Sequence, residues 1–191
     1  MRVAARGSVS IAAVAAWLGL AALGCAGGGT ASGDQAKLDR VQPCQGSSDG
    51  WCKATSQQAG FGAYFPGNVA ESTSAPQPTP TGERVVVHRL ASQNPAGARF
   101  SLTCIEYVEG RADPKKLLAD VTKVGKPEAN VQRGGFEGRL IRYPQGTLQA
   151  IAGPRFLCTQ NVEATNGSAV PSQGDVDRFF RSLVFGALAR P

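Results

Sequence analysis

The cysteines are the residues of this sequence whose types and spacing suggest the most chemistry, namely metal binding or disulfide formation. Besides Cys25, the chain has Cys44, Cys52, Cys104 and Cys158, five cysteines in all. The sequence has no C-x-x-C motif and no cysteine–histidine spacing typical of a metal site, so we expect no bound metal and no cofactor. An even number of remaining cysteines is typical of disulfides in an exported chain, and four cysteines allow three pairings.

The positions of these four cysteines favour the pairs Cys44–Cys52 and Cys104–Cys158. Cys44 and Cys52 flank "QGSSDGW", whose Gly, Ser and Asp residues favour a turn. Cys104 shares a strand face with apolar residues in "RFSLTCIEYV", and Cys158 does so in "RFLCTQNVEA", where Gln160 interrupts the pattern. Two neighbouring strands would bring these cysteines within disulfide range. Four reduced, buried thiols are the alternative.

His88 is the only histidine of the chain. A catalytic triad needs a nucleophile and an orienting carboxylate beside the imidazole, and the sequence locates neither. We therefore interpret His88 as a surface or core residue and assign no catalytic residue. Glu106, Glu109 and Asp113 follow in the sequence and are interpreted as a solvated acidic edge. A pocket that joined His88 to an acid and to a Ser or Thr would instead indicate a hydrolase.

Arginines in the predicted strands offer one candidate binding site. Arg139, Arg142 and Arg155 have Tyr143 nearby, and the planar guanidinium group is suited to carboxylate or phosphate. An anionic envelope polymer or a lipid headgroup would be the ligand. The alternative is that these arginines keep the strand edges soluble and prevent edge pairing.

Residues 1–24 have the pattern of a secretory leader. Arg2 and Arg6 precede an apolar core of about 15 residues, which is the length typical of a signal peptide. A membrane-spanning helix needs about 20 apolar residues, so an uncleaved anchor is one alternative. A second alternative is that Cys25 only ends the apolar stretch and cleavage occurs elsewhere.

The residues around Cys25 resemble the lipobox of bacterial lipoproteins. Small residues, Ala22 and Gly24 among them, precede the cysteine, although Ala22 stands where Leu is commoner. The resemblance implies that the leader is removed and that Cys25 receives fatty acyl chains, and two or more such chains hold a protein stably on a membrane. In a two-membrane bacterium, Ala26 resembles the signal for the outer membrane, facing the periplasm.

Charge and length limit what the mature chain could be. Removing the leader takes away Arg2 and Arg6, so the net charge of +6 becomes +4. No run of five like charges occurs and the basic residues are not interleaved with aromatic ones, which excludes a nucleic-acid partner. We expect residues 25–43 to form a flexible tether and residues 44–191 to form a single globular domain.

The rest of the chain alternates between strand and helix patterns. The segments "GFGAYFPG", "RVVVHRLA", "ARFSLTCIEYV", "GFEGRLIRYP" and "GTLQAIAG" favour strands. The second and third of these favour one hairpin and the fourth and fifth another, and the proline-spaced residues 75–83 favour a connector. Asp113 and Ser172 are candidate N-caps of two amphipathic helices, which end near Gly125 and Gly186.

Strands with apolar residues on both faces need cover on both sides. We therefore predict an α+β fold in which helices cover a mainly antiparallel sheet in an α/β/α arrangement. Over residues 60–185, the order of "GFGAYFPG", "GERVVVHRL", "FEGRLIRYP" and "DVDRFFRSLVF" resembles the PsbP-like sandwich family, which includes small bacterial lipoproteins. That family has no common active site, so the resemblance implies an accessory or binding role.

These observations predict a lipoprotein of the cell envelope, anchored to a membrane through Cys25. Its domain would be a non-enzymatic accessory or binding module that contacts an envelope protein or peptidoglycan. The alternative is an envelope hydrolase whose catalytic groups meet only in the folded chain.

Overall fold

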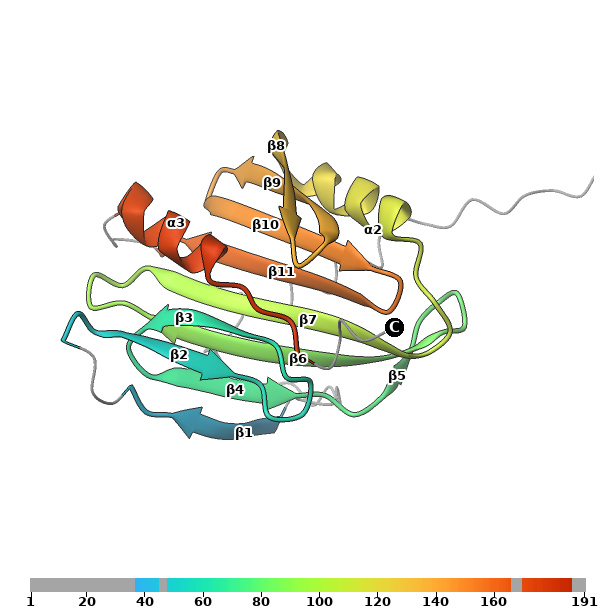
Figure 1. The fold of residues 1–191 in the computed structure, drawn as a ribbon, viewed down its shortest axis with the longest axis horizontal. Coiled ribbons are helices and arrows are strands. Elements are labelled where there is room, and N and C mark those ends of the chain that lie inside the picture. Colours follow the sequence, from blue (N-terminus) through green and yellow to red (C-terminus); the bar gives the residue numbers. More distant parts are fainter. Residues whose placement is uncertain (1–36, 45–47, 166–169, 187–191) are drawn as a thin grey trace, which may run out of the picture. The chain divides into compact units, whose positions relative to one another are not determined.

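Antiparallel strands make up most of the structure (Figure 1). The computed structural model describes residues 37–44, 48–165 and 170–186. The strands are β1 (Lys37–Gln42), β2 (Trp51–Thr55), β3 (Gly62–Pro66), β4 (Val69–Thr73), β5 (Gln77–Pro78), β6 (Arg84–Gln93), β7 (Arg99–Glu109), β8 (Lys126–Arg133), β9 (Phe136–Tyr143), β10 (Gly146–Gly153) and β11 (Phe156–Glu163). The helices are α2 (Pro114–Val121) and α3 (Gln173–Arg181), with a short 3-10 turn, η1 (Thr122–Val124), after α2.

The strands form a large sheet and a separate hairpin. Among the described residues the large sheet has the order β1-β4-β6-β7-β11-β10-β9-β8, with β5 beside β6, and β2 pairs with β3 alone. The predicted hairpins of β6 with β7 and of β9 with β10 are confirmed. β11 returns to pair with β7, which brings residues about 55 positions apart in the chain into direct register.

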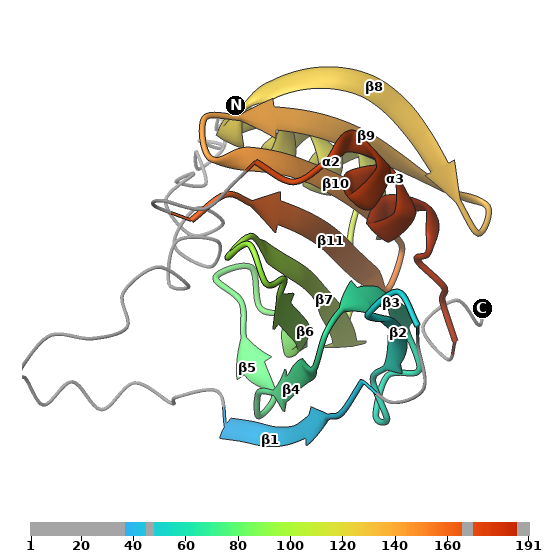
Figure 2. The same ribbon diagram turned by 90° about the vertical axis from the view of Figure 1, so that its left-hand side faces the viewer.

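The inner face of the large sheet, which carries Phe100 and Leu102, packs against β2, β3 and α3. Figure 2 shows the strands in an arc with these three elements on its concave side. Aromatic rings meet edge to face in this core: Phe100 lies 5.5 Å from Phe179 of α3 and 5.6 Å from Trp51 of β2. Burial of large side chains from three separate segments holds the hairpin and α3 on the sheet.

The outer face is the opposite face of the same sheet and carries α2. Leu118 and Val121 of this helix pack against Ile141, Leu148 and Leu157. The side chain of Asp113 accepts hydrogen bonds from the first backbone amides of α2, and Ser172 does so at α3. Both predicted N-caps are confirmed.

The prediction of an α/β/α sandwich with helices covering the sheet is wrong. The fold is β-rich, and its two described helices contain only eight and nine residues. Apolar residues on both strand faces do require cover, but the β2–β3 hairpin supplies much of it on the inner face. The sequence pattern indicates that a face is buried and does not indicate which element buries it.

Strand β1 lies within residues 25–43, which the sequence assigned to a tether. Residues 37–42 pair with β4, so this part of the stretch belongs to the sheet. The leader, Cys25 and the rest of the tether lie outside the described residues. In the described part of the chain, no helix is both long enough and apolar enough to cross a membrane.

Candidate functional site

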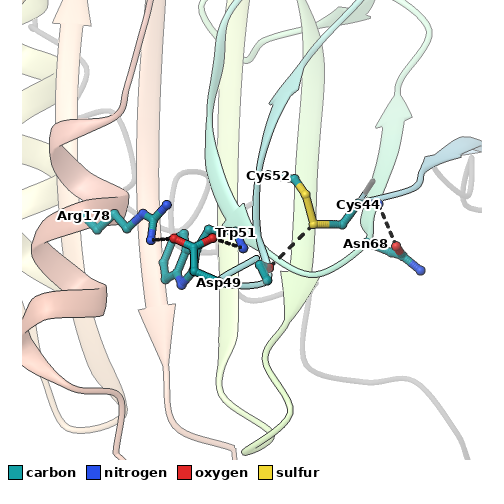
Figure 3. Close-up of a disulfide and its surroundings, with 7 residues drawn as sticks. Cys44, Asp49, Trp51, Cys52, Asn68 and Arg178 are labelled. Carbon is teal, nitrogen blue, oxygen red and sulfur yellow. Dashed lines mark hydrogen bonds and ion pairs between the residues drawn. A yellow bond between two sulfur atoms is a disulfide. The ribbon is translucent and has the colours of Figure 1, made fainter. Parts of the chain in front are cut away.

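Both disulfides form in the pairing that the sequence favoured. Cys104 and Cys158 stand directly opposite each other on β7 and β11, with 4.0 Å between their Cα atoms, and both are fully buried. Cys44 is bonded to Cys52, with 5.4 Å between Cα atoms, and its backbone amide donates to the Asn68 side chain (Figure 3). Because a disulfide sulfur is not a nucleophile, other side chains must supply any chemistry.

A charged contact fastens α3 to the β2–β3 hairpin in the same region. Figure 3 shows Arg178 reaching Asp49, with 2.5 Å between Nη1 and Oδ2. The guanidinium group also lies over the Trp51 ring, 4.8 Å from its centre, and 5.8 Å from the centre of the Tyr64 ring. A cation stacked on aromatic rings stabilises packing, so we interpret Arg178 as structural.

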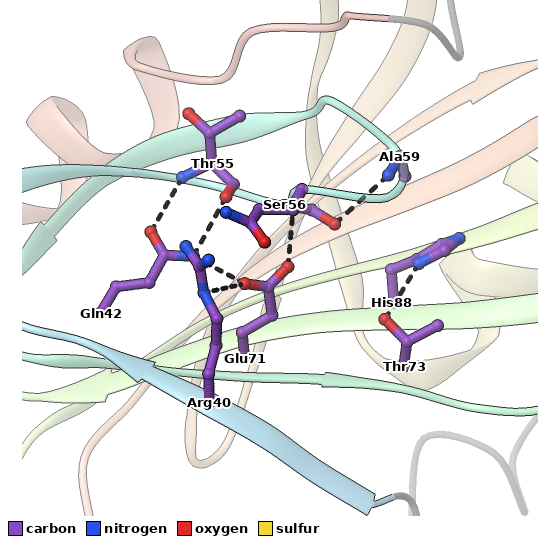
Figure 4. A network of polar contacts seen from close by, with 9 residues as sticks. Arg40, Gln42, Thr55, Ser56, Ala59, Glu71, Thr73 and His88 are labelled. Atoms are coloured by element: carbon purple, nitrogen blue, oxygen red, sulfur yellow. Dashed lines mark hydrogen bonds and ion pairs between the residues drawn. The ribbon is translucent and has the colours of Figure 1, made fainter.

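A second polar network lies under β1, on the inner face (Figure 4). The Glu71 side chain is only 4 % exposed and its Oε2 lies 3.0 Å from Nε of Arg40. Glu71 also accepts from the Gln42 side chain at 2.8 Å and from the backbone amide of Gln57 at 3.0 Å. A carboxylate with three partners needs no ligand, so this network joins β1 and the loop after β2 to β4.

His88 meets both a hydroxyl and a carboxylate. Its Nδ1 lies 3.3 Å from the Thr73 hydroxyl, as Figure 4 shows, and its Nε2 lies 3.2 Å from Oε2 of Glu106. The three residues come from the adjacent strands β4, β6 and β7. The His88 ring is 3 % exposed and lies 6.0 Å from the ring of Phe61. The groups have a triad-like composition, but the imidazole is buried and both of its nitrogens are engaged.

The outer face carries a second set of polar side chains. Arg89, Arg99 and Glu163 are each one position from an inner-face residue, so they point to the outer face. Arg99 stands directly opposite Glu163 in the register of β7 and β11. Burial lowers the pKa of the Arg89 guanidinium, Arg99 lowers this pKa further, and Glu163 acts in the opposite direction. Arg89 thus lies among charged side chains of both signs on this face.

The Glu163 carboxylate already has neutral partners. The Tyr143 hydroxyl donates to its Oε1 at 2.9 Å, and the Asn161 amide donates to the same oxygen at 2.7 Å. Burial and then the nearby charge of Glu163 raise the pKa of Tyr143, so its hydroxyl keeps its proton and donates. The carboxylate is thus held in place beside the arginines.

A hollow of about 450 Å³ opens at the end of this outer face. It lies where the ends of β1, β4, β6 and β7 meet, and its lining includes Val41, Ala70, Ala91, Gln93, Arg99 and Thr165. Three of its eight lining residues are apolar, four are uncharged polar residues, Asn68 and Ser92 among them, and one, Arg99, is charged.

The arginines chosen from sequence do not gather in one place. Arg142 pairs with Glu128 at 2.6 Å, whereas Arg139, three positions earlier on the same strand, points to the opposite face and donates to the carbonyl of Gly138. Arg155 is exposed in the turn between β10 and β11.

Sequence reasoning missed Arg89 and Arg99. A signal was present: in "RVVVHRLA", Arg89 takes the strand face of Val85 and Val87, where an apolar residue is expected. An arginine at such a position is half covered by its neighbours. Arg99 lies on the other strand of the predicted β6–β7 hairpin, but the sequence could not show that Glu163 lies on the same face, because β11 is distant in the chain.

No family model, curated protein or solved structure matches this chain.

Proposed function

We propose that this protein is a lipoprotein of the bacterial cell envelope, held by acyl chains on Cys25 at the outer membrane and facing the periplasm. Its sheet-centred domain works as a non-enzymatic binding module for an envelope protein or peptidoglycan.

The observation that carries this proposal is the number of cysteines and how they pair. Two disulfides use four of the five cysteines, and such bonds persist in oxidising compartments outside the cytoplasm. Cys25 is the fifth cysteine, and it directly follows the apolar leader. An odd cysteine in an exported chain calls for a separate explanation, and acylation supplies one.

The position of β1 limits how far the domain can lie from the membrane. Eleven residues separate Cys25 from Lys37, the first residue of β1. An extended chain covers at most about 3.6 Å per residue, so the sheet would begin within about 40 Å of the lipid. The module would therefore work close to the membrane surface.

Mass spectrometry of the mature protein tests the anchor. We expect a chain that starts at Cys25 and carries the mass of fatty acyl chains, and a Cys25→Ser variant that loses both this mass and membrane sedimentation. A Thr30→Ala variant in the same stretch is the matched control and keeps both. A mature chain that begins elsewhere without acyl groups would refute the proposal.

Partner capture tests the binding role. The lipidated protein, crosslinked in intact cells, should recover a stoichiometric envelope neighbour, or should sediment with purified peptidoglycan in a salt-sensitive manner. Failure of both measurements across growth conditions would argue against a binding module.

An envelope hydrolase is a second candidate, favoured by the contacts of His88. The structure places Thr73 and Glu106 at hydrogen-bond distance from the imidazole, which is the meeting of groups that a hydrolase requires. In this version Thr73 is the nucleophile, His88 the base and Glu106 the orienting group. The burial of the His88 ring fits equally well a structural link between three strands.

Substitution separates these two roles of His88. If Thr73, His88 and Glu106 are catalytic, Thr73→Val abolishes a hydrolytic activity measured on a panel of ester and peptide substrates. The thermal unfolding midpoint of this variant stays close to that of the unmodified chain. Ser74→Ala, at the next position, is the control. Unchanged activity in Thr73→Val and His88→Gln would eliminate the hydrolase.

A further inference from the structure

We propose that strand β1 controls access to His88. While β1 is paired with β4, it keeps residues 56–61 closed over the imidazole, and its release lets them open. We call residues 56–61, which connect β2 to β3, the cover loop. This inference goes beyond the proposed function, because it concerns access to His88, Thr73 and Glu106 whether or not these side chains are catalytic.

The cover loop lies against His88 through its last residue. The Phe61 ring is fully buried and lies 6.0 Å from the ring of His88. Two backbone hydrogen bonds close the loop on itself: the Ser56 amide donates to the carbonyl of Phe61 at 2.8 Å, and the Gly60 amide donates to the carbonyl of Ser56 at 2.9 Å. Because these bonds join its two ends, the cover loop can move as a unit that carries Phe61 with it.

Glu71 of β4 fastens the cover loop to the sheet. Its Oε1 accepts a hydrogen bond from the backbone amide of Gln57 at 3.0 Å, and Figure 4 shows the carboxylate between β1 and the loop. A hydrogen bond to an ionised acceptor is about twice as strong as one between neutral groups. The loop therefore stays closed as long as the Glu71 carboxylate points toward Gln57.

Two side chains of β1 hold that carboxylate in place. Nε of Arg40 lies 3.0 Å from Oε2 of Glu71, and the Gln42 amide donates to the same oxygen at 2.8 Å. The Gln42 amide also donates to the carbonyl of Thr55, the residue directly before the cover loop, at 3.0 Å. A buried carboxylate that loses its cation is unstable, so release of β1 would turn Glu71 toward solvent and free the amide of Gln57.

β1 can leave the large sheet without breaking any other strand pair. It stands at the end of the strand order, and among the described strands it pairs only with β4. Val41 is exposed, and none of the β1 side chains that the structure describes belongs to the buried core. A strand with few buried apolar contacts opens at a lower free energy than the core does.

The disulfide between Cys44 and Cys52 limits this release to β1. Cys44 lies two positions after Gln42, the last residue of β1, and is bonded to a residue of β2. The chain that follows β1 therefore stays attached to the β2–β3 hairpin. A released β1 remains close to its place, so it can pair with β4 again.

The place of β1 in the chain indicates what would release it. Eleven residues separate Lys37, the first residue of β1, from Cys25. In the anchored protein that we propose, a pull between the membrane and a bound partner would act on β1 before any other strand. If the second candidate function holds, the buried state of His88 is the resting state, and release of β1 exposes the catalytic groups.

Chemical modification of His88 tests this inference, because it is the only histidine of the chain. The mature full-length chain with Cys25→Ser is treated with diethyl pyrocarbonate, and mass spectrometry follows the peptide that contains His88. We expect slow modification of this parent chain and modification on the order of tenfold faster in Arg40→Gln and in Glu71→Gln. Glu128→Gln, which breaks an exposed ion pair of β8, should react like the parent.

A variant destabilised elsewhere distinguishes local opening from unfolding. Gln160→Leu removes buried hydrogen bonds beside α3 and should be modified at nearly the rate of the parent. Equal acceleration in Gln160→Leu would show that His88 reacts only through global unfolding and would overturn the inference. Acceleration in Glu71→Gln but not in Arg40→Gln would overturn the role of β1. If Glu71→Gln fails to fold, as checked by the thermal unfolding midpoint, the partly exposed Arg40 still provides the test.

Control by β1 and the proposed functions can fail independently. Faster modification in Arg40→Gln, together with no hydrolytic activity in any variant, would keep the control by β1 and remove the catalytic role. Equal modification of all variants, together with an activity that requires Thr73, would do the reverse. An unacylated Cys25 in cells would remove only the pull on β1.

Discussion

Gln149 and Gln160 face each other across β10 and β11 and close the end of α3. The Gln160 amide donates to the carbonyl of Phe179 at 2.6 Å, and the Gln149 amide donates to the carbonyl of Phe180 at 3.1 Å. Both side chains are at most 2 % exposed, and they are also bonded to each other at 2.8 Å. The last carbonyls of a helix lack partners within the helix, and this pair helps to satisfy them inside the core, together with the amide and hydroxyl of Ser182, which also donate to the carbonyl of Phe179.

Replacing Gln160 by leucine should destabilise the protein. The carbonyl of Phe179 would keep its bonds from the amide and hydroxyl of Ser182 but lose the one from Gln160, and the Gln149 amide would lose one of its two acceptors. Loss of these two hydrogen bonds costs about 1–3 kcal/mol in the free energy of unfolding. Urea unfolding of Gln160→Leu measures this loss. Gln132→Leu, at an exposed position of β8, is the control and should change the midpoint little. Equal effects in the two variants would contradict the role of Gln160.

The two disulfides should contribute unequally to stability. In the chain-entropy model, closing a loop of about 55 residues between Cys104 and Cys158 contributes about 4 kcal/mol, and closing the short loop between Cys44 and Cys52 contributes about 2.5 kcal/mol. Unfolding of the two paired Cys→Ala variants under non-reducing conditions compares these values. A larger loss for the Cys44/Cys52 variant would contradict the expected order.

Glu71 should contribute more to the stability of the fold than an exposed carboxylate does. Glu71→Gln removes the charge that holds Arg40 and weakens the bond from the Gln57 amide, at an expected cost of about 2 kcal/mol. Glu128→Gln breaks the exposed pair with Arg142 and should cost less than about 1 kcal/mol. Chemical denaturation of both variants at neutral pH gives the comparison, and a smaller loss for Glu71→Gln would refute it.

Alkaline pH should destabilise the fold through Tyr143. Burial, assisted by the charge of Glu163, raises the pKa of this hydroxyl in the folded chain. The contribution of the protonated Tyr143 hydroxyl to the free energy of unfolding is fully present below its unfolded pKa of about 10. This contribution is lost as pH rises from there toward the higher pKa of the folded chain. Tyr143→Phe should therefore flatten the fall in unfolding free energy measured above pH 10.

Tyr107 serves as the comparison for this measurement. Burial, and then the negative charge of Glu83, raise the pKa of its hydroxyl as well. Tyr107→Phe should remove a separate share of the alkaline loss. If Tyr143→Phe leaves the pH dependence unchanged, the raised pKa of Tyr143 is not linked to folding.

The local elements followed from the sequence where short-range patterns specify them. The N-caps Asp113 and Ser172, the β6–β7 and β9–β10 hairpins and the two disulfide pairs were all predicted. Strand β8 was not, because most of its side chains are exposed and it lacks the alternation that marks a half-buried strand.

The sequence alone determined which strand faces are buried and which cysteines share them, because side-chain alternation is a property of each segment. Only the tertiary structure decided that a hairpin covers much of the inner face, that Thr73 and Glu106 meet His88, and that Arg89 lies with Arg99 and Glu163. Glu163 reaches this face from β11, which pairs with β7 across a long separation, and which strands pair and in which register is set by the packing of the whole sheet.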